Sequence, residues 1–135
     1  ILVEKKVASL AELDAFLSTF VFQKGDGLFR ATDAISAPRA EEMARLTLEK
    51  KIPFAGTNLF DVQKGALMSY GANYQKMGEQ GAVLVDKILS GGKNPANLPV
   101  ELPADFDLIV NLQTAHALGI EIDPAFLAKA TRLIR

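Results

Sequence analysis

The chain has no cysteine and a single histidine, and these two shortages narrow the chemistry open to it. Without cysteine there are no disulfides and no thiolate metal ligands, and the redox state of the compartment stays undetermined. With one histidine, His116, any metal site would depend on carboxylates alone. We therefore predict neither a metal site nor a cofactor.

The sequence also has no excess of one charge and no long apolar run. The 15 basic and 16 acidic residues are mixed along the chain, so the sequence indicates no surface for nucleic acid or for an anionic membrane. The longest apolar clusters, such as FAG and AVLV, are far too short to span a bilayer. Hydrophobic residues nevertheless make up 49% of the 135 residues, which is enough for the core of one compact domain.

No catalytic motif is present either. The sequence contains no GxSxG, no phosphate-binding loop and no GxGxxG pattern, and Gly91-Gly92 belongs to a turn. His116 lies near the end of a predicted helix, where a packed or solvent-facing role is expected. The acidic pairs Glu41-Glu42 and Asp105/Asp107 lack a convergent partner and are typical of solvated faces. We therefore predict a binding protein rather than an enzyme.

Apolar periodicity predicts strands that alternate with helices. The predicted order is an extended opening (1–7), a helix whose apolar face covers 10–20, a strand (27–31), a helix (37–50), two strands joined by a polar loop (52–56 and 66–71), a helix (73–89), two extended segments (100–103 and 106–112), a short helix (113–119) and a last helix (124–134). This order predicts an α/β fold, a three-layer sandwich around a mostly parallel sheet.

Four of the five predicted helices begin at a capping residue. These residues are Ser9, which forms a capping box with Glu12, then Ser36, Asn73, and Asp123, which precedes Pro124. Gly78 and Gly81 lie one turn apart in the helix over 73–89. We expect them to let that helix approach the sheet closely.

Polar residues follow three successive predicted strands. Thr32 and Asp33 follow the first, Thr57 and Asn58 follow the second, and Tyr70 closes the third. In open α/β sheets small ligands bind at the carboxyl ends of the strands, where a carboxylate suits a ligand ammonium or hydroxyl group. The same residues also fit local roles, since Asp33 suits an Asx-turn and Tyr70 suits a plug at the sheet edge. Taken together, the three strand ends favour a small-molecule binding site.

Three segments of the chain resemble a known protein family. They are LFRATDAISAPRAEEMARLTLEKKIP, KIPFAGTNLFDVQKGALMSYGANY and VDKILSGGKNPANLPVELPADFDLIVNLQTAHALGI. Their distinctive features are a Thr-Asp pair after a strand, GAL and YG around the next strand, a Gly-Lys-x-Pro turn and Asn-x-x-Thr-Ala before Leu-Gly. In combination they resemble the substrate-binding proteins of ABC transporters, in the family that includes tryptophan and other amino-acid binders.

The resemblance implies a type I periplasmic-binding fold, in which two α/β lobes close over a ligand. The chain is similar to the C-terminal half, with 1–122 as a ligand-binding lobe that is incomplete at its N-terminus. Residues 123–135 are then a helix expected to pack on the missing N-terminal lobe. By position, the ligand-side residues are Thr32, Asp33, Ala34, Thr57, Asn58 and Tyr70. Ala34 stands where the family often has Asn, and Asn58 where it often has Asp, which weakens the case for an ammonium ligand.

The resemblance further implies the solute-binding component of an ABC importer, which captures a small molecule such as an amino acid and delivers it to permease subunits. Such a protein works in the periplasm or outside the cell, with a lipid anchor as a further expectation. An effector-sensing lobe of a transcription regulator or sensor protein is the alternative, because it shares the fold. A small α/β enzyme that uses Asp33 is a third hypothesis.

The opening ILVEKKV has no signal-peptide features and begins like the middle of a strand, so we expect a piece of a longer protein. An uncovered strand edge there tends to pair with another chain. Apolar residues of the last predicted helix, among them Phe126 and Ile134, also lack a partner. We therefore predict a homodimer or segment exchange for this chain.

Overall fold

The structure, a computed structural model, describes residues 1–135 and shows an α/β fold, as predicted. The elements are α1 (Leu10–Thr19), β1 (Leu28–Phe29), η1 (Ala37–Arg39), α2 (Ala40–Glu49), β2 (Phe54–Gly56), α3 (Leu59–Gln63), β3 (Met68–Ala72), α4 (Tyr74–Leu89), η2 (Pro95–Asn97), β4 (Phe106–Asn111), α5 (Leu112–Leu118), α6 (Pro124–Leu127) and β5 (Arg132–Ile134). None of the helices is both long and apolar enough to cross a membrane.

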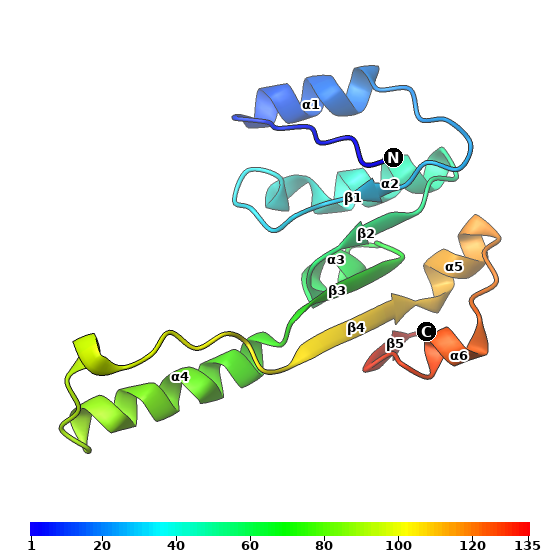
Figure 1. The fold of residues 1–135 in the computed structure, drawn as a ribbon. Helices are drawn as coiled ribbons and strands as arrows, with labels where there is room; N and C mark the ends of the chain where they lie inside the picture. The colour runs from blue at the N-terminus through cyan, green and yellow to red at the C-terminus, as the bar shows by residue number, and fades with distance from the viewer.

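The strands form one sheet in the order β1-β2-β3-β4-β5 (Figure 1). Neighbouring strands are parallel except β3 and β4, which are antiparallel. The mostly parallel sheet is therefore confirmed. Because of this arrangement, the carboxyl ends of β1, β2 and β3 meet at one edge of the sheet, together with the start of β4.

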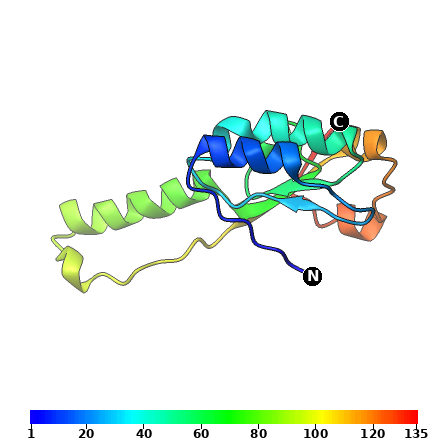
Figure 2. The same ribbon diagram turned by 90° about the horizontal axis from the view of Figure 1, so that it is seen from above.

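Helices α1 and α2 pack on one face of the sheet and supply most of the core. The core cluster consists of Leu13, Leu17, Met43, Ala44, Phe54 and Ala66. Helix α5 lies on the same side as α2, whereas α6 lies on the other side of the sheet (Figure 2). The core cluster thus lies in the half of the molecule that contains β1 and β2.

Most of the predicted helix caps are present. The Ser9 hydroxyl accepts the Glu12 amide at 3.2 Å, and the Glu12 carboxylate accepts the Ala8 amide at 2.9 Å. Asn73 caps α4 by accepting the Lys76 amide at 2.9 Å. These local hydrogen bonds satisfy amides that have no partner within the helix, which is why the sequence predicts them well.

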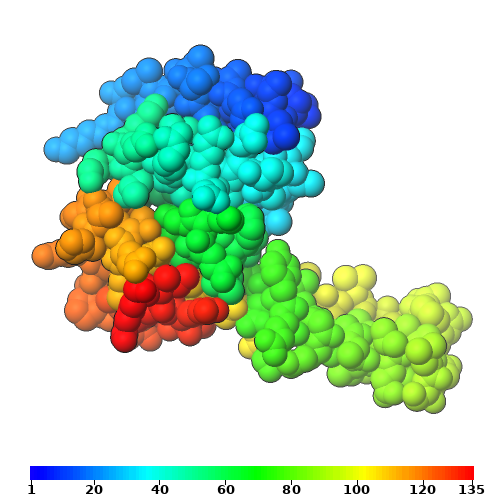
Figure 3. Space-filling view, turned by 180° about the vertical axis from the view of Figure 1, so that it is seen from behind, coloured from blue at the N-terminus to red at the C-terminus, as the bar shows by residue number.

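Helix α4 and the segment that follows it form an arm that stands away from the body (Figures 1 and 3). None of the 16 residues of α4 is buried. A methyl group at Gly78 or Gly81 would have no neighbour within 4 Å. The expected close approach of this helix to the sheet is wrong, because β3 leads the chain past the edge of the sheet before the helix begins.

The two ends of the chain differ from the prediction. Residues 1–7 form no strand, because no strand of the sheet lies beside them to supply backbone hydrogen bonds. The uncovered strand edge predicted there is therefore absent. Residues 100–103 likewise form no strand, and the polar loop predicted before β3 contains the short helix α3.

The predicted helix through Ile134 is also wrong. Helix α6 ends at Leu127, and residues 132–134 form β5, which pairs parallel with β4. The Thr131 amide and hydroxyl both donate to the Leu108 carbonyl oxygen, at 2.8 and 3.1 Å. Without β5 the outer edge of β4 would leave its backbone groups unpaired, so strand pairing prevails over the helical pattern of the sequence.

Candidate ligand-binding site

Three of the predicted site residues come together at the carboxyl edge of the sheet. The hydroxyl groups of Thr32 and Thr57 are hydrogen-bonded to each other. The Asn58 side-chain amide donates to Thr32 Oγ1 at 3.4 Å, and its carbonyl oxygen Oδ1 caps α3 by accepting the Asp61 amide at 3.3 Å. The segments that follow β1 and β2 therefore present their polar residues side by side, as the sequence predicts.

Asp33 closes a local turn, which the sequence analysis gave as the alternative to a role in ligand binding. Its Oδ1 accepts the Ile35 and Ser36 amides, both at 2.7 Å, and its Oδ2 accepts the Ser36 hydroxyl. Ser36 occupies the N-cap position of η1, as predicted, but it makes no side-chain capping bond, because its hydroxyl donates to Asp33. These hydrogen bonds, with the Ser36 hydroxyl the strongest, lower the pKa of Asp33. Asp33 and Ala34 are exposed in this turn and do not line the cavity described below.

A buried ion pair fixes the segments that carry these residues. The Arg30 side chain, at the end of β1, donates from Nε to Asp61 Oδ1 at 2.9 Å and from its Nη1 to the Ser36 hydroxyl at 3.3 Å. Asp61 Oδ2 accepts the Thr57 amide at 3.1 Å. The network joins β1, the turn before α2 and the start of α3, so it holds the carboxyl edge of the sheet in one arrangement. Sequence reasoning missed both charges, although an arginine in a predicted buried strand signals a buried partner.

Two glycines allow the segment before α3 to lie directly on the sheet. A methyl group at Gly56 would overlap the Asp61 carboxylate, and one at Gly71 would overlap the Thr57 carbonyl oxygen. Gly56 thus leaves room for the buried Asp61 side chain, and Gly71 lets the backbone at Thr57 approach β3 more closely than a side chain would permit.

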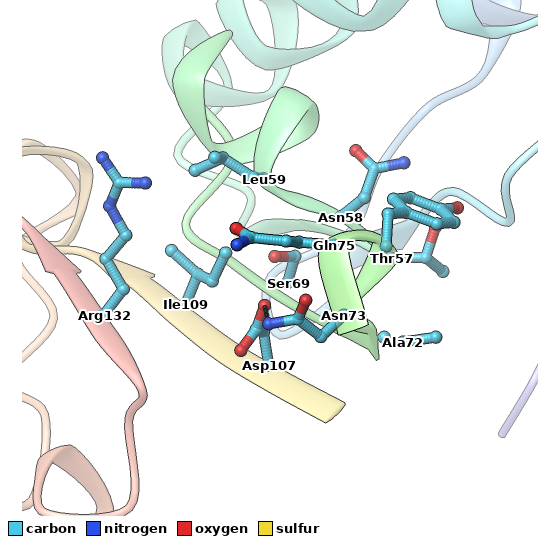
Figure 4. Close-up of a pocket in the computed structure, with 12 residues that line it drawn as sticks. Thr57, Asn58, Leu59, Ser69, Ala72, Asn73, Gln75, Asp107, Ile109 and Arg132 are labelled. Carbon is cyan, nitrogen blue, oxygen red and sulfur yellow. Dashed lines mark hydrogen bonds between the residues drawn. The ribbon is translucent and has the colours of Figure 1, made fainter. Parts of the chain in front are cut away.

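A cavity of about 310 Å³ opens between this segment, the start of α4 and the sheet (Figure 4). Its polar lining includes Thr57, Asn58, Ser69, Asn73, Asp107 and Arg132, and Leu59 and Ile109 contribute apolar surface. Ser69 lies between Gly56 and Ile109 in the register of the sheet, and Ile109 pairs with Arg132. The strands β3, β4 and β5 thus form the floor of the cavity.

Sequence reasoning missed several polar residues of this cavity, among them Asp107, Asn73, Ser69 and Arg132. Asp107 was expected on a solvated face, but its Oδ2 accepts a hydrogen bond from Asn73 Nδ2 at 3.0 Å inside the cavity. Asn73 was identified only as a helix cap. Ser69 lies on the floor, and the one signal for it is the alternation in MSYGA, which places Ser69 and Gly71 on the face opposite Met68 and Tyr70.

Tyr70 lies on the other face of the sheet. It is 59% exposed, and its ring stacks on Phe106 with the centroids 5.7 Å apart. Because its neighbours Ser69 and Gly71 line the cavity, the alternation of side chains along β3 directs Tyr70 away from it. The structure therefore does not bring Tyr70 together with Thr32, Thr57 and Asn58.

No group of three or more histidine or acidic side chains is placed to hold a metal ion. His116, the one histidine, is exposed on α5 and does not line the cavity.

Residues 1–134 match the family described as ABC transporter substrate binding protein. The chain belongs to this family. The resemblance identified in the sequence is thereby confirmed, and the family description agrees with the prediction of a binding protein.

Several relatives are known individually. A tyrosine-binding protein from Clostridioides difficile (strain R20291) is 29% identical over 119 residues, which are 88% of this chain and 34% of that protein. The crystal structure of a conserved domain protein from Vibrio cholerae O1 biovar eltor is 32% identical, with a TM-score of 0.79, over 97% of this chain and 44% of that one. An ABC domain from Streptococcus pneumonia in complex with L-Trp has a TM-score of 0.78 at 23% identity, over 95% of this chain and 43% of that one, and shows the shared fold. The chain thus spans less than half the length of these relatives.

Proposed function

We propose that this chain forms one lobe of a solute-binding protein that captures an amino acid and delivers it to the permease of an ABC importer. The observation that carries the proposal is the cavity at the carboxyl edge of the sheet, in a chain of this family. Ligands of open α/β sheets bind at such edges, where strand ends and helix starts supply polar groups.

The lining of the cavity fits an amino acid with a large side chain. Asp107 and Arg132 provide one negative and one positive charge, and Leu59 and Ile109 provide apolar surface. The relative from Clostridioides difficile binds tyrosine by its name, and the Streptococcus structure holds L-Trp. We propose an aromatic amino acid as the ligand, held against this cavity.

The arm supplies a place for the second lobe. Val83, Val85 and Leu89 of α4 are each more than half exposed, although apolar side chains of this size are mostly buried when a partner is present. We propose that the rest of the protein packs on this helix and closes over the cavity. Binding then takes place in the periplasm or outside the cell, with a lipid anchor as the means of retention at the membrane.

A ligand screen tests the proposal. The complete protein that contains this chain is heated with L-tyrosine, L-tryptophan, L-phenylalanine, a sugar panel and a nucleobase panel, and each shift is followed by titration calorimetry. A ligand at 100 times its dissociation constant stabilises a protein by about 2.7 kcal/mol, which is a readily measured shift in melting temperature. We expect a shift with at least one of the three amino acids. A shift with a sugar or nucleobase alone would contradict the amino-acid proposal.

A further inference from the structure

Ser69 is the one residue whose buried side-chain polar atom has no hydrogen-bond partner in the protein. The residue is 1% exposed and lies within β3. Buried hydroxyl groups are almost always paired, because an unpaired one gives up its bonds to water without replacement. An alanine would fill this position without that cost, so the hydroxyl needs an explanation outside the fold itself.

Ser69 lines the cavity, and its neighbours in the sheet offer its hydroxyl no partner. Its neighbour in β2 is Gly56, which has no side chain to donate or accept, and its neighbour in β4 is Ile109. Ser69, Asn73 and Asp107 lie together in the central part of the cavity (Figure 4). Ser69 therefore lies in the floor of the cavity, with an unpaired hydroxyl next to the space that a ligand would occupy.

Asp107 offers a carboxylate oxygen in the same place. Its Oδ2 accepts from Asn73 Nδ2 at 3.0 Å, whereas its Oδ1 has no hydrogen-bond partner in the protein. No lysine, arginine or histidine nitrogen lies within 4.0 Å of this carboxylate. Its neighbour across the sheet is Gly71, so no side chain covers it from β3. The negative charge of Asp107 is thus fixed by Asn73 and left without a cation.

We propose that Ser69 and Asp107 form the subsite for a primary ammonium group of the ligand. The inference rests on the proposed function and assigns the head group of the amino acid to these two residues. An ammonium group has three N–H donors. One donates to Asp107 Oδ1 and a second to Ser69 Oγ, and the Ser69 O–H is then free to donate to the carboxylate of the same amino acid.

Pairs of ligands that differ only in the ammonium group test the proposed ammonium subsite directly. Titration calorimetry on the complete protein compares L-tyrosine with 3-(4-hydroxyphenyl)propionate, and L-tryptophan with indole-3-propionate. We expect Asp107→Asn to weaken binding of the amino acid about tenfold or more and to leave the affinity for the analogue unchanged. The matched control is Asp105→Asn, a carboxylate two residues away that is exposed and does not line the cavity. An equal loss for amino acid and analogue, or no loss for either, would overturn the inference.

The Ser69→Ala variant provides a second test, in which stability without ligand is expected to stay or rise while affinity for the amino acid falls. We expect the variant to keep or exceed the melting temperature of the wild type without ligand, because it removes an unpaired buried hydroxyl. The affinity for the amino acid is expected to fall about two- to tenfold. A lower melting temperature with unchanged affinity would show that the hydroxyl serves the fold and would overturn the inference.

The outcomes separate this inference from the proposed function. Wild-type binding of an amino acid that Asp107→Asn and Ser69→Ala do not weaken would overturn the ammonium subsite alone. Binding of none of the three amino acids by the wild type, with a sugar or nucleobase bound instead, would overturn the amino-acid proposal and the subsite together.

Discussion

Arg30 Nε lies 2.9 Å from Asp61 Oδ1, and the two side chains are 3% and 0% exposed. The pair joins the end of β1 to α3, so a charge interaction inside the protein sets the position of the segments that line the cavity. Both charges are also hydrogen-bonded to other groups, Arg30 to the Ser36 hydroxyl and Asp61 to the Thr57 amide. A buried pair that is satisfied in this way is tolerated, whereas either charge alone is not.

Replacing one member of this pair is expected to be costly. Arg30→Met leaves the Asp61 carboxylate buried without a cation, and we expect the free energy of unfolding to fall by about 3–5 kcal/mol in urea denaturation. The control is Arg45→Met, because Arg45 forms an ion pair with Glu49 on the surface of α2, where both side chains are 58% exposed. That change is expected to cost less than about 0.5 kcal/mol. Similar losses for both variants would contradict the importance of the buried pair.

Gly71 is expected to tolerate no side chain. A methyl group there overlaps the Thr57 carbonyl oxygen, so Gly71→Ala must push the segment before α3 off the sheet. We expect a loss of about 2 kcal/mol or more in the free energy of unfolding, and weaker ligand binding as the cavity changes shape. Gly27→Ala is the comparison, since its nearest neighbour, the Pro53 carbonyl oxygen, is 3.5 Å away. A loss from Gly71→Ala no larger than that from Gly27→Ala would show that the two segments do not touch.

Asp33 makes the stability of the turn before α2 dependent on pH. The Ser36 hydroxyl, with the Ser36 and Ile35 amides, lowers the pKa of Asp33 from its usual value of 3.8. A lowered pKa means that the charged carboxylate stabilises the folded state at pH values above its unfolded pKa, and that this contribution is lost as the pH falls through the folded pKa. Asp33→Asn is therefore expected to melt at a lower temperature than the wild type near neutral pH, and the difference is expected to vanish in strong acid. A difference that stays constant from neutral pH to about pH 2 would contradict this assignment.

The position of Tyr70 predicts which substitutions alter ligand affinity. Because Tyr70 stacks on Phe106 on the face away from the cavity, Tyr70→Leu is expected to change the affinity for the amino acid less than twofold. Thr57→Val removes the hydroxyl of a residue that lines the cavity and is expected to weaken binding about two- to tenfold. Titration calorimetry compares the two. A larger loss from Tyr70→Leu would place the ligand on the opposite face of the sheet.

Much of the fold follows from local sequence signals. Ser9, Asn73 and Asp123 each use a side-chain oxygen to satisfy an amide at a helix start, and such bonds depend on neighbours within three residues. The strands that contain Phe54 and Val110 are short apolar runs between turn residues, which also identifies them locally. The meeting of Thr32 with Thr57 then follows from the parallel order of β1 and β2.

The remaining features depend on contacts between distant parts of the chain. β5 forms because β4 offers it an open edge, although its sequence continues a helical pattern. The α4 arm leaves the body because of the direction of β3, which the helix sequence does not encode. Ser69 and Asp107 look like ordinary strand residues in the sequence. They line the same cavity because of the register of β3 against β4 and because Gly56 has no side chain. No local pattern in a single sequence predicts such pairings between distant strands.

The central claim is that the cavity at the carboxyl edge of the sheet is where the ligand binds. A crystal structure of the complete protein with the amino acid that binds most tightly tests it most directly. We predict that the ligand lies between Thr57 and the floor of β3 and β4, with its ammonium nitrogen about 3 Å from Asp107 and from Ser69 Oγ. A ligand with no contact to Thr57, Ser69 or Asp107 would contradict the account.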